Sequence, residues 1–161
     1  SMAVSGASLK GLDLDAWTDR IFDVIERTRS KIVADFGLPE ESQRILFVSS
    51  AMLTRLRPSE EVSALPYWKP HVDKANVPSY DYSALLYLST KGEHFEGGDF
   101  AFLDAGQHVI VEPRRGRLLT FTSGLENVHE VRKVTAGTRF ALAMWFTLSE
   151  SHAGLDESTW K

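Results

Sequence analysis

The stretch RFALAMWFTL, residues 139–148, has two distinct faces when it is read as a β-strand. Side chains alternate between the two faces of a strand. One face carries four bulky apolar side chains, those of Phe140, Leu142, Met144 and Phe146, and is suited to packing on a helix. The other face carries Arg139, Ala141, Ala143, Trp145 and Thr147. Because two alanines leave space beside an arginine, this face predicts a site for an anionic group.

The rest of the chain supplies one long helix and a series of strands. From Leu14 to Phe36 apolar residues recur at steps of three and four, which predicts an amphipathic helix with Asp13 or Asp15 as N-cap and Gly37 at its end. The apolar positions are Trp17, Ile21, Val24, Ile25, Ile32 and Phe36. About seven short β-type runs follow, separated by turns that contain Gly or Pro. This order indicates a mainly β sandwich or barrel with a helical buttress.

The composition favours one globular domain over residues 1–161, with 43% hydrophobic and 11% aromatic residues. The formal net charge of −4, from 18 basic and 22 acidic residues, predicts no nucleic-acid partner. The absence of cysteine excludes a disulfide scaffold and a thiolate metal site. No apolar run is long enough to span a bilayer, so we expect no membrane contact from these residues.

The sequence leaves the cellular compartment open. Ser1-Met2 is typical of a tag remnant, so we expect that a native leader or anchor has been removed. Cysteine-free domains occur both in the secretory pathway, including the endoplasmic reticulum, and in the cytoplasm. The oligomeric state is open in the same way.

A candidate metal site begins at the His71-Val72-Asp73 motif. A third candidate ligand, His129, lies in the strand-like run VHEVRKV, 56 residues beyond Asp73. Two histidines and one carboxylate form the facial triad of non-haem iron(II) oxygenases, which leaves positions open for a cosubstrate and dioxygen. Residues so far apart in the chain meet only if the strands roll into a closed structure. The other histidines, His94, His108 and His152, are interpreted as solvated.

Three stretches together resemble the 2-oxoglutarate- and iron-dependent oxygenases of the prolyl 4-hydroxylase type. They are PHVDKANVPSYDYSALLYLS, EGGDFAFLD and VEPRRGRLLTFTSGLENVHEVRKVTAGTRFALAMWFT, and the resemblance covers roughly residues 66–148. It is nearest to the branch called 2-oxoglutarate and iron-dependent oxygenase domain-containing proteins. The implied fold is a double-stranded β-helix, or jelly roll, over about residues 45–148. The helix at about 13–37 would pack on one sheet, and residues 149–161 would form a polar tail.

The resemblance also implies roles for individual residues. His71, Asp73 and His129 would be the catalytic iron ligands. Arg139 would hold the far carboxylate of 2-oxoglutarate with help from the Tyr87 hydroxyl. Trp145 would line the floor beneath the metal. The sequence departs from the family at Leu56, where relatives often carry a tyrosine that contacts the cosubstrate.

The implied function is an Fe(II)- and 2-oxoglutarate-dependent dioxygenase, supported by ascorbate, that releases succinate and CO2. It would use dioxygen to hydroxylate an amino-acid residue in a peptide, with proline favoured, or a free amino acid. Two alternatives stay open at this point. One is a non-catalytic jelly-roll binding module that retains the ligands, and the other is a cupin-like metal enzyme without a 2-oxoacid. The roles of Tyr67 and Trp68, beside the metal motif, are also open.

Overall fold

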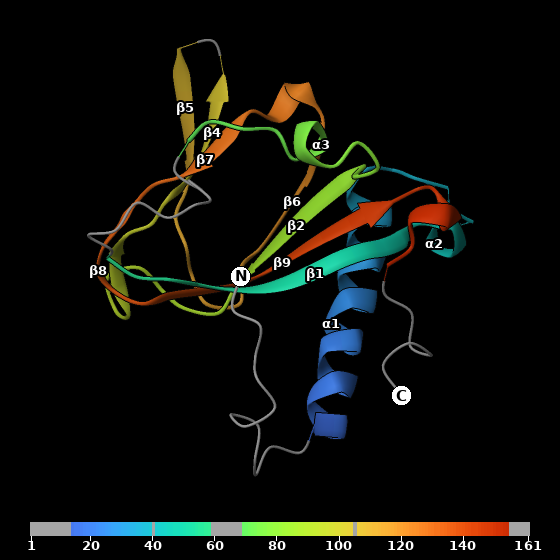
Figure 1. Ribbon diagram of the computed structural model, residues 1–161, viewed down its shortest axis with the longest axis horizontal. Helices are drawn as coiled ribbons and strands as arrows, with labels where there is room; N and C mark the ends of the chain where they lie inside the picture. The colour runs from blue at the N-terminus through green and yellow to red at the C-terminus, as the bar shows by residue number, and fades with distance from the viewer. Residues whose placement is uncertain (1–13, 40, 59–68, 105, 155–161) are drawn as a thin grey trace.

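The computed structural model describes residues 14–39, 41–58, 69–104 and 106–154 as a mainly β structure with an N-terminal helix (Figure 1). The helices are α1 (Leu14–Asp35), α2 (Ser42–Ile45) and α3 (Asp73–Asn76), with 3-10 turns η2 (Leu125–Asn127) and η3 (Glu150–His152). The strands are β1 (Phe47–Leu56), β2 (Tyr82–Tyr87), β3 (Phe95–Gly97), β4 (Phe100–Asp104), β5 (Gln107–Val111), β6 (Leu118–Thr122), β7 (His129–Val131), β8 (Val134–Gly137) and β9 (Arg139–Thr147). Among these helices, none is both long and apolar enough to cross a membrane.

The strands form two main antiparallel sheets that enclose a core. The larger sheet has the order β1-β9-β2-β6 and the smaller sheet has the order β5-β4-β7, while β3 pairs with β8. Side chains from the two sheets meet between them, chiefly Leu85, Tyr87, Phe100, Phe121, Ala141 and Ala143. Figure 1 shows α1 on the opposite face of the larger sheet. The first and last strands are neighbours, so the chain closes on itself around this core.

The packing of α1 confirms most of the predicted apolar face of β9. Leu142, Met144 and Phe146 are buried in one cluster with Ile25 and Ile32 of the helix. The prediction was wrong for Phe140, which is 37% exposed. Phe140 lies near the start of β9, and α1 crosses the sheet nearer the other end of that strand (Figure 1).

The limits of α1 agree with the predicted helix. The backbone N–H of Leu38 donates to Val33 O (2.9 Å) and that of Gly37 donates to Ala34 O (3.3 Å). This pair of bonds is a Schellman motif, and Gly37 supplies its left-handed residue with φ +60°. Asp15 lies inside the helix rather than at its cap, and Asp13 lies outside the described residues. Trp17 and Phe36, both predicted on the buried stripe, are 48% and 36% exposed.

The run VHEVRKV was predicted as one strand and is divided between two sheets. β7 pairs with β4, whereas β8 pairs with β3, a short strand that the sequence did not predict. Between them the backbone N–H of Arg132 donates to Asp99 O (2.8 Å), and Lys133 O accepts from Gly98 N (3.0 Å). These bonds hold the chain at its crossing from one sheet to the other. The short helices α2 and α3 were not predicted either.

Candidate metal centre

The three candidate ligands, His71, Asp73 and His129, are brought together at one edge of the smaller sheet. His71 and His129 form an antiparallel bridge, in which each backbone N–H donates to the other residue's carbonyl at 2.9 and 3.0 Å. Asp73 is the first residue of α3, two positions further on. One ligand atom from each of the three side chains lies within 4.8 Å of the others. Backbone pairing therefore joins His71 and His129, which are 58 positions apart in the sequence.

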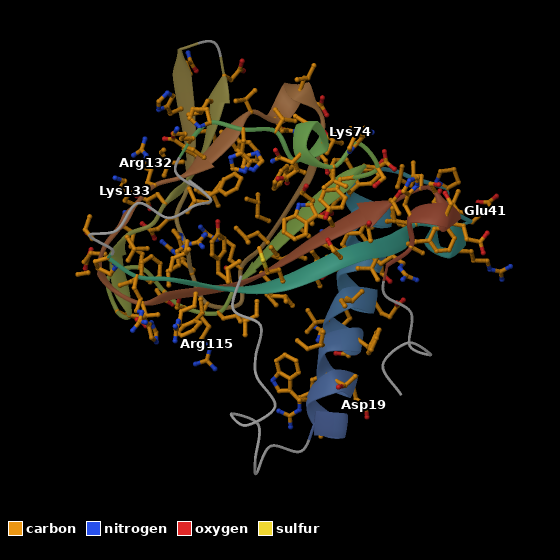
Figure 2. All side chains as sticks on the ribbon, viewed as in Figure 1. Asp19, Glu41, Lys74, Arg115, Arg132 and Lys133 are labelled. Carbon is orange, nitrogen blue, oxygen red and sulfur yellow. The ribbon has the colours of Figure 1, made fainter. Side chains whose placement is uncertain are left out.

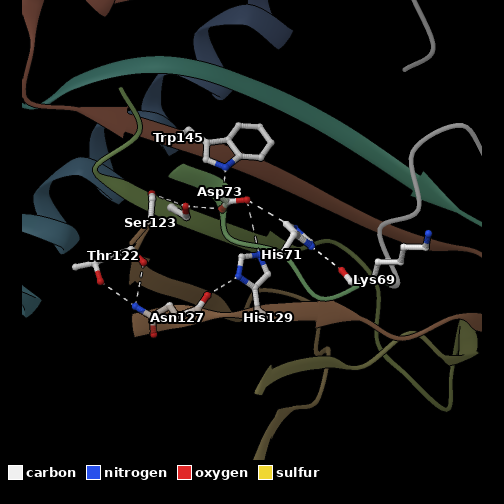
Figure 3. Close-up of polar contacts among 9 residues, drawn as sticks. Lys69, His71, Asp73, Thr122, Ser123, Asn127, His129 and Trp145 are labelled. Carbon is white, nitrogen blue, oxygen red and sulfur yellow. Dashed lines mark hydrogen bonds and ion pairs between the residues drawn. The ribbon is translucent and has the colours of Figure 1, made fainter. Parts of the chain in front are cut away.

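Both imidazole rings are held with the same nitrogen toward Asp73. The Nδ1 atoms lie 2.9 Å from backbone carbonyls, that of His71 from Lys69 O and that of His129 from Asn127 O (Figure 3). A carbonyl only accepts, so each Nδ1 carries the proton that it donates, and in the neutral ring Nε2 then has a free lone pair. The Nε2 atoms of His71 and His129 lie 3.8 and 3.7 Å from Asp73 Oδ1. In this tautomer Nε2 is the nitrogen that can bind a metal, while Nδ1–H holds the ring in place.

The environment of His129 keeps its ring neutral and fixed. The ring stacks on Phe100 with centroids 4.9 Å apart and meets the edge of Phe121 at 5.0 Å. Burial lowers the pKa of His129, although the Asn127 carbonyl and the Asp73 carboxylate act in the opposite direction. Its side chain is 4% exposed, whereas that of His71 is 31% exposed. Of the two histidines, His71 is therefore the one that solvent can reach.

The Asp73 carboxylate lies against the larger sheet. Its Oδ2 atom accepts hydrogen bonds from Ser83 Oγ (2.6 Å) on β2 and from Trp145 Nε1 (3.0 Å) on β9 (Figure 3). Ser83 also meets Ser123, with the two hydroxyl oxygens 2.8 Å apart. The ligand group thus spans the space between the sheets, with histidines on one side and Asp73 tied to the other. The structure places Trp145, predicted beneath the metal, in direct contact with a candidate ligand.

Arg139 and Tyr87 lie side by side further along the same inner face. Their side chains are fully buried, with relative exposures of 1% and 0%, and the guanidinium carbon lies 5.2 Å from the centre of the Tyr87 ring. Burial raises the pKa of Tyr87 to about 12, against the opposing effect of the Arg139 charge. The phenol is therefore protonated. Because an arginine only donates, the phenolic proton has no acceptor among the described residues.

Two small side chains separate Arg139 from Trp145 on the inner face of β9. Ala141 and Ala143 follow Arg139 on the same face of β9 and are 0% and 7% exposed. Leu56, at the position where the family often has a tyrosine, is the register partner of Arg139 on β1. The inner face thus runs from a buried cation, past two alanines, to the residue that contacts Asp73.

Comparison with known proteins places the chain in a family. The model of the 2OG-Fe(II) oxygenase superfamily matches residues 64–147, just over half of the 161 residues. The chain belongs to the 2OG-Fe(II) oxygenase superfamily. The matched region contains the three candidate ligands and Arg139, and this membership confirms the resemblance seen in the sequence.

Two named relatives are similar to this chain over different lengths. The "2-oxoglutarate and iron-dependent oxygenase domain-containing protein 3" of Xenopus tropicalis is 40% identical over 151 residues, covering 91% of this chain and 47% of that protein. "Prolyl 3-hydroxylase 2" of Rattus norvegicus is 42% identical over 85 residues, 49% of this chain and 12% of that protein. The chain therefore spans about half the length, or less, of these relatives.

Solved structures of the superfamily confirm the predicted fold. The viral collagen prolyl hydroxylase vCPH from Paramecium Bursaria Chlorella virus-1, in its 2OG complex, superposes with a TM-score of 0.58 at 14% identity. The match covers 81% of this chain and 74% of that chain. The two facing sheets of this superfamily member are thus a double-stranded β-helix with an N-terminal helix.

Several residues around the candidate ligands were not anticipated from the sequence. They are Ser83, Ser123, Asn127, Phe100 and Tyr80, whose ring stacks on Trp145. Strand alternation places Ser83 on the same face as Tyr87 and so could have marked it as inward-facing, but not as a partner of Asp73. His94, His108 and His152 are exposed and lie outside the ligand group. Tyr67 and Trp68 lie outside the described residues.

Proposed function

We propose that this chain is an Fe(II)- and 2-oxoglutarate-dependent dioxygenase that hydroxylates an amino-acid residue, with peptidyl proline as the favoured substrate. The observation that carries the proposal is the two-histidine, one-carboxylate group on the same inner surface as a buried arginine. Superfamily membership supports the reaction class. The similarity to relatives named as prolyl hydroxylases supports proline over other residues.

The donor set of His71, Asp73 and His129 fits Fe(II). Two neutral imidazoles and one carboxylate suit this ion, and the set contains no soft sulfur ligand. The Nδ1 bonds to backbone carbonyls aim both Nε2 atoms at the point where Asp73 Oδ1 lies. The chain would thus hold the ion between these two Nε2 atoms and Asp73 Oδ1.

Arg139 and Tyr87 fit the far carboxylate of 2-oxoglutarate. The guanidinium offers a planar pair of donors, and the phenolic proton requires an acceptor. The small side chains of Ala141 and Ala143, which follow Arg139 on the same face of β9, would lie beside the carbon chain of the cosubstrate. When bound, Fe(II) and 2-oxoglutarate would supply the oxidative chemistry, with decarboxylation to succinate and CO2 and transfer of one oxygen atom to the substrate. The protein's part would be to hold the far carboxylate of the cosubstrate against the buried side chains of Arg139 and Tyr87.

Succinate release tests the proposed activity directly. The purified chain with Fe(II), ascorbate and 2-oxoglutarate is expected to form succinate, and to form it faster when a suitable proline-containing peptide is present. The peptide should gain the mass of one oxygen atom. Omission of Fe(II) or of 2-oxoglutarate should each stop succinate formation. Metal binding without any succinate, across a panel of proline peptides and free amino acids, would favour the non-catalytic module or the cupin-like enzyme.

Gly98 offers a separate test of the arginine site. A Cβ atom at Gly98 would lie 3.0 Å from Arg139 Cδ and 2.8 Å from Phe95 Cε2, so Gly98→Ala is expected to displace the arginine side chain. Affinity for 2-oxoglutarate should fall by about tenfold, which corresponds to roughly 1.4 kcal/mol. Calorimetric titration of 2-oxoglutarate into the Mn(II) form measures this change.

Gly92→Ala is the matched control for Gly98→Ala. Both glycines have left-handed backbone angles, φ +81° for Gly92 and +66° for Gly98, so both substitutions cost about 1–2 kcal/mol of stability. No atom lies within 4 Å of a Cβ built at Gly92. Equal losses of 2-oxoglutarate affinity in the two variants would mean that backbone strain, rather than the position of Arg139, determines the result.

A further inference from the structure

The two oxygens of the Asp73 carboxylate lie in different surroundings. Oδ1 is the atom that faces the Nε2 atoms of both histidines, at 3.8 and 3.7 Å. Oδ2 points to the larger sheet and accepts two hydrogen bonds there, from Ser83 and Trp145. The Asp73 side chain is only 12% exposed, so solvent has little access to compete for these bonds.

The direction of each bond around Oδ2 follows from the donors available. A carboxylate only accepts and an indole N–H only donates. Ser83 therefore donates its single hydroxyl proton to Asp73, and Ser123 must donate to Ser83 Oγ across their 2.8 Å contact. Ser123 also accepts the backbone N–H of Lys74 in α3, through its carbonyl at 3.0 Å. This chain of hydrogen-bond donors thus ends on Oδ2, and both side-chain donors to Asp73 among the described residues bond to that oxygen rather than to Oδ1.

The donors are fixed by the sheet itself. Ser83 and Trp145 are register partners on β2 and β9, and Ser50 is the register partner of Trp145 on β1. The Trp145 ring stacks on Tyr80, with centroids 5.4 Å apart and 13° between planes, and Tyr80 is hydrogen-bonded to Ser50 at 2.7 Å. Two residues on adjacent strands therefore donate to one carboxylate oxygen, and Ser50 on the next strand supports Trp145 through Tyr80.

We propose that Ser83 and Trp145 are positioning residues that limit Asp73 to one metal-binding oxygen. They hold Oδ2 away from the ion and present Oδ1 to it. This inference rests on the proposed function, because it takes Asp73 as a metal ligand. Two imidazole nitrogens and a single carboxylate oxygen fill one face of an octahedron and leave the opposite face open. A carboxylate that bound through both oxygens would take one of the positions that the cosubstrate and dioxygen need.

Metal binding by Ser83→Ala and Trp145→Phe tests this assignment without reference to turnover. Each variant removes one donor to Oδ2, and phenylalanine keeps an aromatic ring against Tyr80. Affinity for Mn(II), measured by calorimetry, is expected to fall by about tenfold or more in each variant, as for other partners of metal ligands. The visible absorption spectrum of the Co(II) form should also change, because it reports the geometry of the ligands rather than the stability of the fold.

Ser89→Ala is the matched control for Ser83→Ala. Ser83 and Ser89 are each 2% exposed, but Ser89 exchanges its hydrogen bonds with the backbone of Phe140. The Ser89→Ala variant should lose about as much thermal stability as Ser83→Ala, while keeping the wild-type Mn(II) affinity and Co(II) spectrum. If wild type binds Mn(II) through the triad and the two variants match it in affinity and spectrum, the positioning role is wrong and the proposed function stands. Failure of the wild type to bind Mn(II), Co(II) or Fe(II) would overturn both.

Discussion

Loss of the Asp73 carboxylate is expected to reduce the affinity for divalent metal by about 100-fold or more. Asp73→Ala removes the anionic member of the group and leaves two imidazoles, whose residues are joined by an isolated backbone bridge. The reduction should exceed the roughly 10–100-fold that follows loss of an outer partner of a ligand, because the ligand itself is removed. Titration of Mn(II) into both proteins, followed by metal analysis after gel filtration, measures the effect.

Asp99→Ala controls for the removal of a largely buried carboxylate. Asp99 is 8% exposed and accepts hydrogen bonds from Lys91 Nζ at 2.6 and 2.8 Å, so its loss should destabilise the protein. It lies outside the ligand group and should leave Mn(II) affinity unchanged. Wild-type metal content in purified Asp73→Ala would contradict the assignment of the triad, and with it the proposed reaction.

The alternation of residues in β9 predicted correctly which face of the strand packs on a helix for most of its length. It predicted that Leu142, Met144 and Phe146 pack on a helix while Arg139, Ala141 and Ala143 face the interior. It failed at Phe140, because alternation gives the face of a strand but not the length of strand that a helix covers. A similar limit applies to Trp17, near the start of α1, and Phe36, just beyond its end, which were predicted on the apolar stripe but are 48% and 36% exposed.

The candidate site shows where local patterns stop being informative. Period and spacing gave no reason for His71 and His129 to be neighbours, since their bridge joins segments far apart in the chain. The resemblance to the oxygenases supplied that relation. It did not supply Ser83, whose contact with Asp73 depends on how α3 lies against β2. Hydrogen bonds between side chains on different elements follow from tertiary geometry that a single sequence does not encode in any local pattern.

Substitution of Arg139 is expected to distinguish most clearly between an oxygenase and a non-catalytic binding module that retains the metal ligands. Arg139→Ala removes a buried guanidinium from the inner face and should reduce affinity for 2-oxoglutarate by more than about tenfold. A partly buried pair between a guanidinium and a carboxylate contributes about 2–5 kcal/mol, so the loss could reach several decades. Metal affinity should remain near wild type, because Arg139 is not among the candidate ligands. Arg139→Lys keeps the charge without the planar pair of donors, so its affinity for 2-oxoglutarate should lie between those of wild type and Arg139→Ala.

Calorimetric titration of 2-oxoglutarate into the Mn(II) forms measures the effect, with Arg132→Ala as the control. Arg132 lies on the outside of the protein, where its side chain is 43% exposed beside Glu130 (Figure 2). Its removal takes away the same charge from the molecule but should not change the affinity. If Arg139→Ala and Arg132→Ala both bind 2-oxoglutarate as wild type does, the buried arginine has a different partner. In that case the cupin-like or binding-module alternative would explain Arg139 better than an oxygenase does, since only the oxygenase requires a carboxylate at this end of the inner face.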